Sequence, residues 1–448
     1  MPYIPNTQEE REEMLKVVGV DSMQELWEKA EVPLTDSDFP GLPNGRSEFE
    51  IINMFKKLAA KNASDLTCFI GAGFYDHFAP AAVSDLIGRG EFLTAYTPYQ
   101  PEVSQGTLQA IYEFQSSICK ITGMDVSNAS MYEGGTALFE AALMAVRQTK
   151  RKKLVIAGGI SPIYQRMLES YNANLNLELV FVPVTDNSTT AADLLAAVGE
   201  KDTAAILIQY PNFFGEFSDW TAFNADLKAK DKKVVTICSA YPTALALLKT
   251  PAEMGFDIAC GEAQCLGLPL AFGGPYLGYL ACTKKLMRKL PGRICGKTVD
   301  SEGREGYVLT LQAREQHIRR EKANSNICSN QGLCALAATV YLSLIGKEGF
   351  KQVAELSSSK AAYTRQLMLE IPGVKAVTGE NFFNEFVIET SCDARELSSK
   401  LINKGFLIGY PLGGYYPGRE KQLLIALTEQ RTKEEIKGLV TALEGSLC

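Results

Sequence analysis

The sequence predicts an α/β protein in which a mostly parallel sheet is flanked by helices, followed by a small C-terminal α+β domain. From about residue 66, short apolar runs typical of buried strands alternate with longer amphipathic segments. This alternation favours a parallel sheet that is covered on both faces. With 448 residues, of which 46% are hydrophobic, the chain can bury a large core. We expect residues 66–325 to form the large α/β domain.

The first 65 residues are expected to form an N-terminal helical arm. Three pairs match the capping-box pattern ahead of amphipathic runs: Thr7/Glu10, Ser22/Glu25 and Ser47/Glu50. Residues 32–45, between the second and third pair, are rich in Pro, Gly and Asp, which is typical of an extended segment. Such an arm either crosses a subunit interface or wraps the surface of its own chain.

The large domain is predicted element by element from its apolar pattern. Six short apolar runs predict strands at residues 153–157, 177–182, 204–209, 233–238, 257–260 and 277–282. Four amphipathic segments predict helices at residues 105–122, 136–147, 162–171 and 191–198.

Residues 326–448 are expected to hold long linker helices and the small C-terminal domain. Helices are predicted at residues 330–345, 347–371, 394–403 and 433–444, with strands at 384–390 and 423–426. The stretch 323–346 carries no charge over a membrane-spanning length, but its first half is rich in Asn and Ser, which lipid disfavours. We therefore interpret it as a buried core helix.

Composition argues against several classes of protein. The net charge of −7 gives no electrostatic support for binding nucleic acid, and the polar, acidic N-terminus lacks the apolar stretch of a secretory signal. The eleven cysteines form no Cys-x-x-Cys pair and the chain has only two histidines, so we expect no metal site. We expect a cytoplasmic protein with reduced, mostly inert thiols and no membrane partner.

The loop before the helix predicted at residue 105 is the first candidate functional segment. Two prolines, two tyrosines and two glutamines lie within residues 95–106, which suits a rigid loop lined by polar and aromatic side chains. An ordinary connection into the helix is the alternative. The candidate residues are Tyr96, Thr97, Tyr99, Gln100, Glu102 and Gln105.

A second candidate is the turn Glu133-Gly134-Gly135-Thr136, which leads into a predicted helix. The free N–H groups at a helix N-terminus can hold an anion such as a phosphate. Helix starts of this kind are common, however, and the acidic Glu133 favours helix capping over phosphate capture. Both interpretations stay open at this point.

Charged and titratable residues give two weaker signals. His77 follows Asp76, and it is either a base polarised by that carboxylate or, as we favour, a partner in a structural hydrogen bond. Basic residues cluster at 284–297 and 314–322. They fit either an acidic partner or a cofactor phosphate, or else solvated helix faces and interdomain ion pairs.

Specific motifs then point to a family. The sequence Thr-Pro-Tyr-Gln-Pro-Glu-Val-Ser-Gln-Gly at residues 97–106, with residues 122–130, 311–323, 325–328 and 428–436, resembles the P-protein of the glycine cleavage system, glycine dehydrogenase (decarboxylating). The resemblance covers nearly the whole chain. It is to the N-terminal half of the P-protein, which many bacteria and archaea make as a separate subunit 1.

The resemblance implies a pyridoxal-phosphate (PLP)-dependent transferase fold of type I and an obligate partner, subunit 2. Together the two subunits would form an oxidoreductase that decarboxylates glycine, releases CO₂ and passes the aminomethyl group to the lipoyl arm of H-protein. In this family the reactive lysine and the PLP belong to the partner half. The resemblance therefore implies that no PLP is covalently bound to this chain. Whether the assembly is one αβ pair or a heterotetramer stays open.

The sequence departs from a complete PLP enzyme at two positions. Gln264 stands where the resemblance places the Schiff-base lysine, and glutamine has no nucleophilic nitrogen. No aspartate lies between Lys233 and Phe256, where a carboxylate would pair with the cofactor's pyridinium nitrogen. We therefore expect no catalytic residue within this chain alone.

We expect the chain to shape a site that it shares with its partner. Tyr96, Thr97, Tyr99, Gln100, Glu102 and Gln105 would line the partner's site, and Glu133, Gly134, Gly135 and Thr136 would be a relic phosphate loop. One alternative is a purely structural or docking subunit. Another is a self-sufficient PLP enzyme that uses a different lysine, such as Lys249 or Lys284.

Overall fold

The computed structural model describes residues 6–31, 45–93, 95–185, 187–271 and 273–447. The chain divides into two compact units, Met1–Ser64 and Asp65–Cys448, and each is described by itself. The boundaries predicted at residues 65/66 and 325/326 stay predictions.

The described residues of the first unit form three helices, α1 (Gln8–Val18), α2 (Met23–Lys29) and α3 (Glu48–Ala59). Thr7 and Ser47 form the reciprocal capping boxes that the sequence predicts. The third predicted box is only half formed, because Ser22 accepts from the Glu25 N–H while the Glu25 carboxylate binds the Asp21 N–H instead. Most of the predicted extended segment, residues 32–44, lies outside the described residues.

The second unit is built on a seven-stranded sheet with the order β2-β8-β7-β6-β5-β3-β4. Its strands are β2 (Val126–Ser127), β3 (Lys153–Ala157), β4 (Glu178–Val182), β5 (Thr203–Tyr210), β6 (Val235–Ala240), β7 (Ile258–Glu262) and β8 (Gly278–Cys282). Strands β3 to β7 pair in parallel, whereas β8 is antiparallel to both of its neighbours. The predicted mostly parallel sheet is confirmed.

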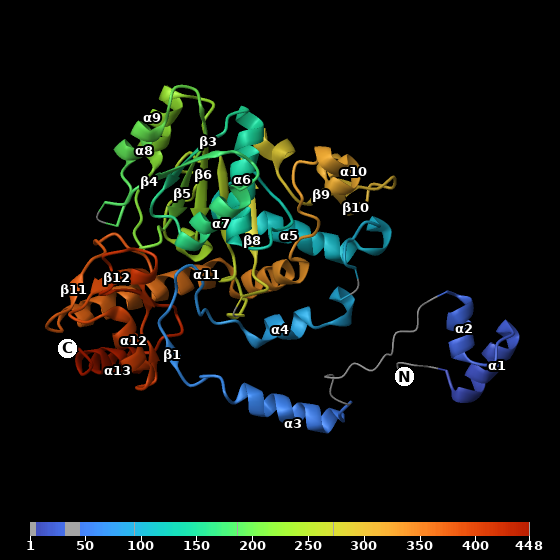
Figure 1. Cartoon of the computed structure of the whole chain (residues 1–448). Helices are drawn as coiled ribbons and strands as arrows, with labels where there is room; N and C mark the ends of the chain where they lie inside the picture. Colours follow the sequence, from blue (N-terminus) through green and yellow to red (C-terminus); the bar gives the residue numbers. More distant parts are fainter. Residues whose placement is uncertain (1–5, 32–44, 94, 186, 272, 448) are drawn as a thin grey trace. The chain divides into compact units, whose positions relative to one another are not determined.

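Side chains alternate between two cores, one on each face of the sheet. On β3, Val155 joins one core, while Leu154 and Ile156 join the other. The first core packs against α5 (Gln105–Thr122), α9 (Thr221–Lys230) and α11 (Gly332–Leu369). The second packs against α6 (Gly134–Thr149) and α7 (Pro162–Asn172). Helices α4 (Ala81–Ile87) and α8 (Ala191–Ala197) complete this part of the chain (Figure 1).

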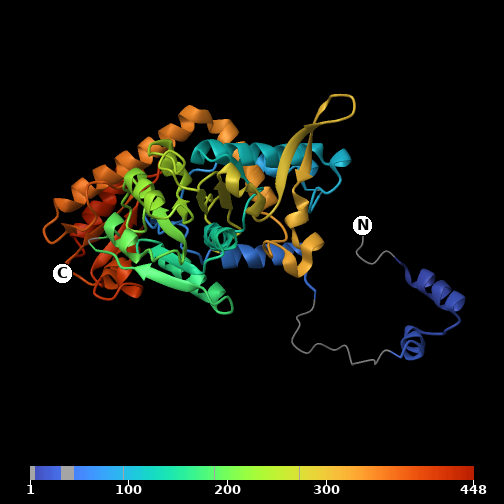
Figure 2. The same cartoon turned by 90° about the horizontal axis from the view of Figure 1, so that it is seen from above.

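The sequence did not predict the hairpin formed by β9 (Ile294–Val299) and β10 (Glu305–Thr310). The hairpin projects from the unit, and the outer half of β9 is exposed (Figure 2). Its strands therefore lack the apolar runs that mark the strands of the main sheet. Helix α10 (Gln316–Arg319) follows it.

Helix α11 joins the two linker helices that the sequence predicts, and it bends where they were expected to divide. Gly346 has a non-helical backbone there, with φ 59° and ψ −172°. The uncharged residues 323–331 precede the helix rather than belonging to it. By length and composition alone α11 is apolar enough to cross a membrane, but in this fold it packs against α4, α5 and α13 (Lys433–Glu444).

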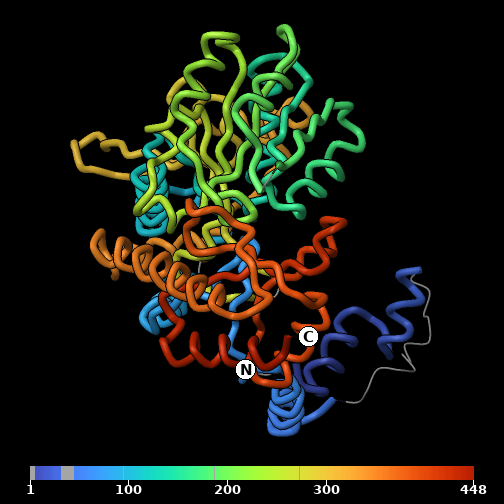
Figure 3. Tube along the Cα trace, turned by 90° about the vertical axis from the view of Figure 1, so that its left-hand side faces the viewer, coloured from blue at the N-terminus to red at the C-terminus, as the bar shows by residue number. Residues whose placement is uncertain are grey.

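The predicted small α+β domain is present at the C-terminus. Its antiparallel sheet has the order β11-β12-β15-β14, from β11 (Lys375–Ala376), β12 (Glu385–Glu389), β14 (Tyr410–Pro411) and β15 (Gln422–Ala426). Helices α12 (Ala394–Ile402) and α13 cover it. Strand β1 (Thr67–Cys68) pairs with β13 (Phe406–Leu407), so the segment that opens the predicted large domain packs into the C-terminal part instead (Figure 3).

Most of the free cysteines agree with the prediction of inert thiols because they are buried or half-buried, whereas Cys328 is exposed. Nine described cysteines are free, and burial raises the pKa of several thiols, for example that of Cys265 to about 12. Cys392 is disulfide-bonded, which contradicts the expectation that every thiol is reduced.

Candidate functional site

A polar cavity lies at the carboxyl ends of β5, β6 and β7, where parallel sheets usually bind ligands. It has a volume of about 590 Å³ including its open mouth. Four parts of the chain contribute polar groups to it. They are the segment after β1 (Tyr75), the ends of the strands and the residues that follow them (Gln209, Asn212, Ser239, Tyr241 and Glu262), the start of α7 (Ser161 and Tyr164), and the C-terminal domain (Asn384 and Glu385).

Gln264 is buried two residues beyond β7, and its amide is fully used inside the protein. Its Nε2 donates to the carbonyl oxygens of Tyr75 (3.1 Å) and Leu268 (2.7 Å), and its Oε1 accepts from the Tyr75 N–H (3.1 Å). A side-chain amide can donate and accept at once, as a neighbouring β-strand would, whereas a lysine can only donate. Gln264 therefore holds the backbone of Tyr75 at the edge of the cavity.

The N-terminus of α6 is occupied by two carboxylates of the chain itself. The Gly134 N–H donates to Glu262 Oε2 at 2.9 Å, and the Thr136 N–H donates to Glu133 Oε1 at 2.8 Å. Glu133 is the N-cap of the helix, so the capping interpretation of this turn is confirmed. The other oxygen of Glu262 accepts from the N–H groups of Gln264 (2.9 Å) and Leu277 (3.0 Å).

Glu385 closes the opposite side of the cavity. Its carboxylate accepts from the Ala72 N–H at 2.6 Å and from the Tyr75 hydroxyl at 2.8 Å. Burial raises the pKa of Glu385 to about 7, although both hydrogen bonds lower it.

These residues do not fit a PLP cofactor. No lysine lines the cavity among the residues that the structure describes, and β6 ends in Ser239 and Ala240, where a pyridinium partner would need a carboxylate. The N–H groups at the start of α6 already face carboxylates, which would repel a phosphate.

The two alternative lysines lie elsewhere. Lys249 pairs with Asp219 at 2.6 Å and its side chain is 55% exposed. Lys284 begins the short 3-10 helix Lys284–Lys289, and neither lysine is among the residues that line the cavity.

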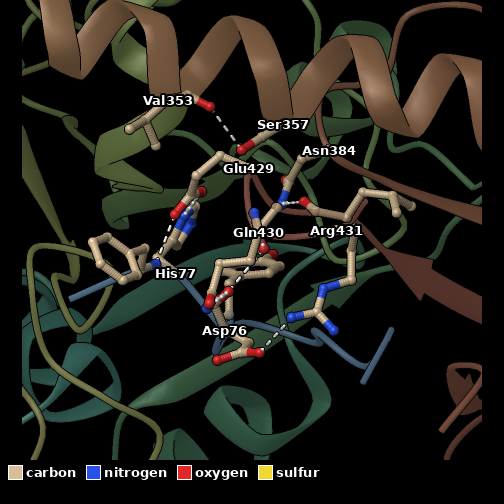
Figure 4. A network of polar contacts seen from close by, with 12 residues as sticks. Asp76, His77, Val353, Ser357, Asn384, Glu429, Gln430 and Arg431 are labelled. Atoms are coloured by element: carbon tan, nitrogen blue, oxygen red, sulfur yellow. Dashed lines mark hydrogen bonds and ion pairs between the residues drawn. The ribbon is translucent and has the colours of Figure 1, made fainter. Parts of the chain in front are cut away.

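His77 has a different carboxylate partner from the one suggested by the sequence (Figure 4). Its Nδ1 lies 2.6 Å from Glu429 Oε2, and its Nε2 contacts the Tyr241 hydroxyl. The adjacent Asp76 pairs instead with Arg431 at 3.1 Å. The less favoured alternative, a His77 base polarised by Asp76, is therefore wrong. The buried His77 joins three parts of the fold, as expected for the structural hydrogen bond that we favoured.

The loop 96–105 lies at a different place on the same unit. Tyr96 is 80% exposed and Tyr99 is 49% exposed. Tyr96 and Pro98 line a second, largely apolar cavity, together with Ala110 and Ile111 of α5 and Leu333 and Leu336 of α11. Gln100 and Glu102 are also exposed. None of the loop residues is among those that line the first cavity.

Tyr99 contacts a buried arginine behind the loop. The Arg293 guanidinium carbon lies 5.7 Å from the centre of the Tyr99 ring, and the His317 ring lies at the same distance on an edge. Arg293 is only 2% exposed and lies 3.9 Å from Glu315, whereas Lys284, Lys285 and Arg288 are exposed. The first basic cluster therefore divides between the interior and the surface.

Gln105, predicted to line a shared site, is engaged within the chain. Its Nε2 donates to the carbonyl oxygens of Pro101 (2.7 Å) and Tyr307 (2.9 Å), and its Oε1 accepts from the Tyr307 N–H (2.8 Å). It thereby ties the loop to β10. This contact could not be predicted from the sequence, because Tyr307 lies in the hairpin that was not predicted.

Comparison with known proteins relates the whole chain to one family. Residues 1–443 match the model of the family described as "Glycine cleavage system P-protein". Two curated relatives named "Probable glycine dehydrogenase (decarboxylating) subunit 1", from Maridesulfovibrio salexigens and Nitratidesulfovibrio vulgaris, are each 50% identical over 447 residues and covered in full, as is this chain.

Solved structures agree. A crystal structure of glycine decarboxylase (P-protein) of the glycine cleavage system, in inhibitor-bound form, has a TM-score of 0.92 and 41% identity, with full coverage of both chains. Glutamate decarboxylase from Lactobacillus brevis, at 13% identity and a TM-score of 0.69, covers 95% of this chain and 97% of its own, and shows the fold alone. The fold is that of fold type I PLP-dependent enzymes.

Proposed function

Because the chain belongs to the glycine cleavage system P-protein family, we propose that it acts as subunit 1 together with a partner, subunit 2, that holds the PLP. The pair decarboxylates glycine, releases CO₂ and transfers the aminomethyl group to the lipoyl arm of H-protein, in the cytoplasm. The bound cofactor supplies the electron sink for the carbanion formed by decarboxylation. This chain is not catalytic alone.

One observation carries the proposal: the groups at and next to this cavity that would have to hold the cofactor are hydrogen-bonded within the chain itself. Gln264 is committed to Tyr75, and Glu262 and Glu133 occupy the N-terminus of α6. A chain of this family that cannot hold the cofactor must act on a site that another subunit provides.

The loop 96–105 is the part of this chain that we assign to the shared site. Tyr96 and Tyr99 expose aromatic surface next to an apolar cavity, which is typical of a surface that a partner covers. Gln100 and Glu102 supply exposed polar groups on the same loop, whereas the Thr97 hydroxyl is buried. Gln105 sets the position of the loop. In this arrangement the loop forms one wall of the partner's site and excludes water from it.

The test is glycine–bicarbonate exchange by each subunit alone and by their mixture. We expect exchange only in the mixture. The Tyr99→Ala variant should lower exchange at least tenfold while the complex still assembles on gel filtration. Tyr171→Ala is a matched control, because Tyr171 is 46% exposed but lies on α7.

Two outcomes would contradict the proposal. Exchange by this chain alone would mean that another lysine carries the cofactor. Normal exchange by the assembled Tyr99→Ala complex would favour a purely structural or docking subunit. For that second candidate, the exposed Lys284, Lys285 and Arg288 offer a basic surface in an acidic chain.

A further inference from the structure

The carboxylate of Glu262 lies inside the cavity at the N-terminus of α6. It accepts three backbone hydrogen bonds, from Gly134 (2.9 Å), Gln264 (2.9 Å) and Leu277 (3.0 Å). Helix α6 is 16 residues long, and an anion at its N-terminus is favoured by the free N–H groups and by the helix dipole. Glu262 thus sits where an anionic ligand would be bound.

The surroundings fix this carboxylate in place. Glu262 is the last residue of β7 and is 7% exposed. A Cβ atom on Gly134 would meet the Tyr164 hydroxyl and would lie 2.8 Å from the Glu262 nitrogen. A Cβ atom on Gly278 would lie 2.5 Å from the Glu133 carbonyl oxygen. The two glycines therefore allow β7, β8 and α6 to approach closely around Glu262.

No cation among the described residues explains this burial. No ion pair joins Glu262 to a cation in the part of the chain that the structure describes, and all three of its partners are neutral N–H groups. Burial raises the pKa of Glu262 to about 7 although these hydrogen bonds lower it, and the nearby Glu133 raises it further. Burial disfavours the ionised form of this carboxylate, and among the described residues its hydrogen-bond partners are N–H donors. It therefore occupies the position and makes the contacts that a bound anion would.

We propose that Glu262 is a built-in substitute for the phosphate of a cofactor, and that this carboxylate, in addition to the absence of an amine at Gln264, closes the cavity to PLP. The inference rests on the proposed function, since it names the residue that leaves cofactor binding to the partner. Removing the carboxylate leaves the N–H groups of Gly134, Gln264 and Leu277 directed at an empty space that an external anion can fill.

The first experiment measures inorganic phosphate binding to the full chain by calorimetric titration. We expect Glu262→Ala to bind phosphate at least tenfold more tightly than the unmodified chain. Glu385→Ala is the matched control, because Glu385 is an equally buried carboxylate of the same cavity but accepts from the Ala72 N–H and the Tyr75 hydroxyl, not from a helix N-terminus. Phosphate binding by Glu262→Ala that is no tighter than that of the control would overturn the proposal.

Thermal unfolding covers the case in which Glu262→Ala folds poorly. Phosphate or formate should raise its midpoint by several degrees and should leave the midpoints of Glu385→Ala and Glu262→Gln unchanged. The glutamine keeps the acceptor oxygen and fills the space without the charge. A Glu262→Ala chain that stays unfolded in both anions, while Glu262→Gln folds, would also overturn the proposal.

A second experiment separates the carboxylate from the missing amine. PLP retained after gel filtration is measured for Gln264→Lys and for the double variant Glu262→Ala/Gln264→Lys. We expect at least tenfold more retained cofactor in the double variant, and equal retention by both would contradict the role of Glu262. These measurements use the chain without its partner, whereas the proposed function is tested by exchange in the mixture of both subunits. A failure of the Glu262 proposal is therefore distinguishable from a failure of the proposed function.

Discussion

Two buried carboxylates, Glu262 and Glu385, face the same cavity, and neither is paired with a cation among the described residues. Burial raises the pKa of each to about 7. Tyr75, which donates to Glu385, stays neutral because burial raises its pKa well above the ordinary value. The folded chain therefore takes up protons at these carboxyl groups at a pH where the unfolded chain has lost them.

This proton uptake makes stability depend on pH. Both groups have an ordinary pKa of 4.5, so they stabilise the fold most below that pH, and their contribution is lost as the pH rises through about 7. Between these values each group lowers the free energy of unfolding by about 1.4 kcal/mol per pH unit. Denaturant unfolding from pH 5 to 8 measures the slope.

In the variant Glu385→Gln, the free energy of unfolding should depend less steeply on pH than in the unmodified chain. The difference in slope should correspond to roughly one bound proton. Glu434→Gln is the control, since Glu434 is exposed in the first turn of α13. An equal slope in Glu385→Gln would show that Glu385 is ionised in the fold at pH 5.

At the residue scale the sequence predicted what Gln264 lacks, but not what it does. A glutamine cannot supply the cofactor amine, and that follows from its chemistry alone. Its clamp on Tyr75 joins residues 189 positions apart, and nothing in the local pattern marks such a pair. Glu262 is hidden for the same reason, because in the sequence it is only a polar residue after a short apolar run.

At the scale of elements, Gln105 couples the loop 96–105 to the hairpin. Its amide binds both backbone groups of Tyr307 and the carbonyl oxygen of Pro101. The loop and β10 are therefore held by one side chain at the start of α5. Gln105 acts as a positioning residue for the loop.

Removing this amide should release β10 at its edge. In Gln105→Ala the Tyr307 N–H loses its acceptor, so its hydrogen exchange should become at least tenfold faster, which corresponds to about 1.4 kcal/mol of local stability. Mass spectrometry of peptides that span residues 294–310 measures the change. Gln109→Ala is the control, because Gln109 lies on the same helix and its amide donates to Glu113 rather than to the hairpin. Unchanged exchange at Tyr307 would show that the β9–β10 pairing is stable without the Gln105 side chain.

The main elements followed from the sequence because burial imposes a visible pattern. The runs that predict β3 to β8 are apolar since the sheet is covered on both faces, and α5 and α13 begin and end where expected. The hairpin escaped prediction because its stability comes from Gln105 and from packing against α5 rather than from an apolar run. Helix α9 was not predicted because its ten residues form no clear amphipathic pattern.

At the scale of the second unit, its parts meet at His77 (Figure 4). The segment after β1 supplies His77, the residue that follows β6 is Tyr241, and the loop after β15 supplies Glu429. Arg431 of the same loop pairs with Asp76. The motif at residues 428–436 indicated the family, but the sequence predicted no role for it. In the structure its first residues join the C-terminal domain to the rest of the unit.

Breaking this junction should uncouple the C-terminal domain. In Glu429→Leu the Phe78 N–H loses its acceptor at 2.7 Å and His77 loses its carboxylate, which we expect to cost on the order of 2–3 kcal/mol. The lost free energy belongs to the contact between the C-terminal domain and the rest of the unit, because Glu429 lies in neither hydrophobic core. Urea unfolding followed by Trp220 fluorescence, in a Trp27→Phe background, should then separate from unfolding followed by circular dichroism, whereas the two transitions coincide in the unmodified chain. Glu434→Leu on α13 should leave them coincident. Coincident transitions in Glu429→Leu would mean that the packing of α11 alone holds the unit together.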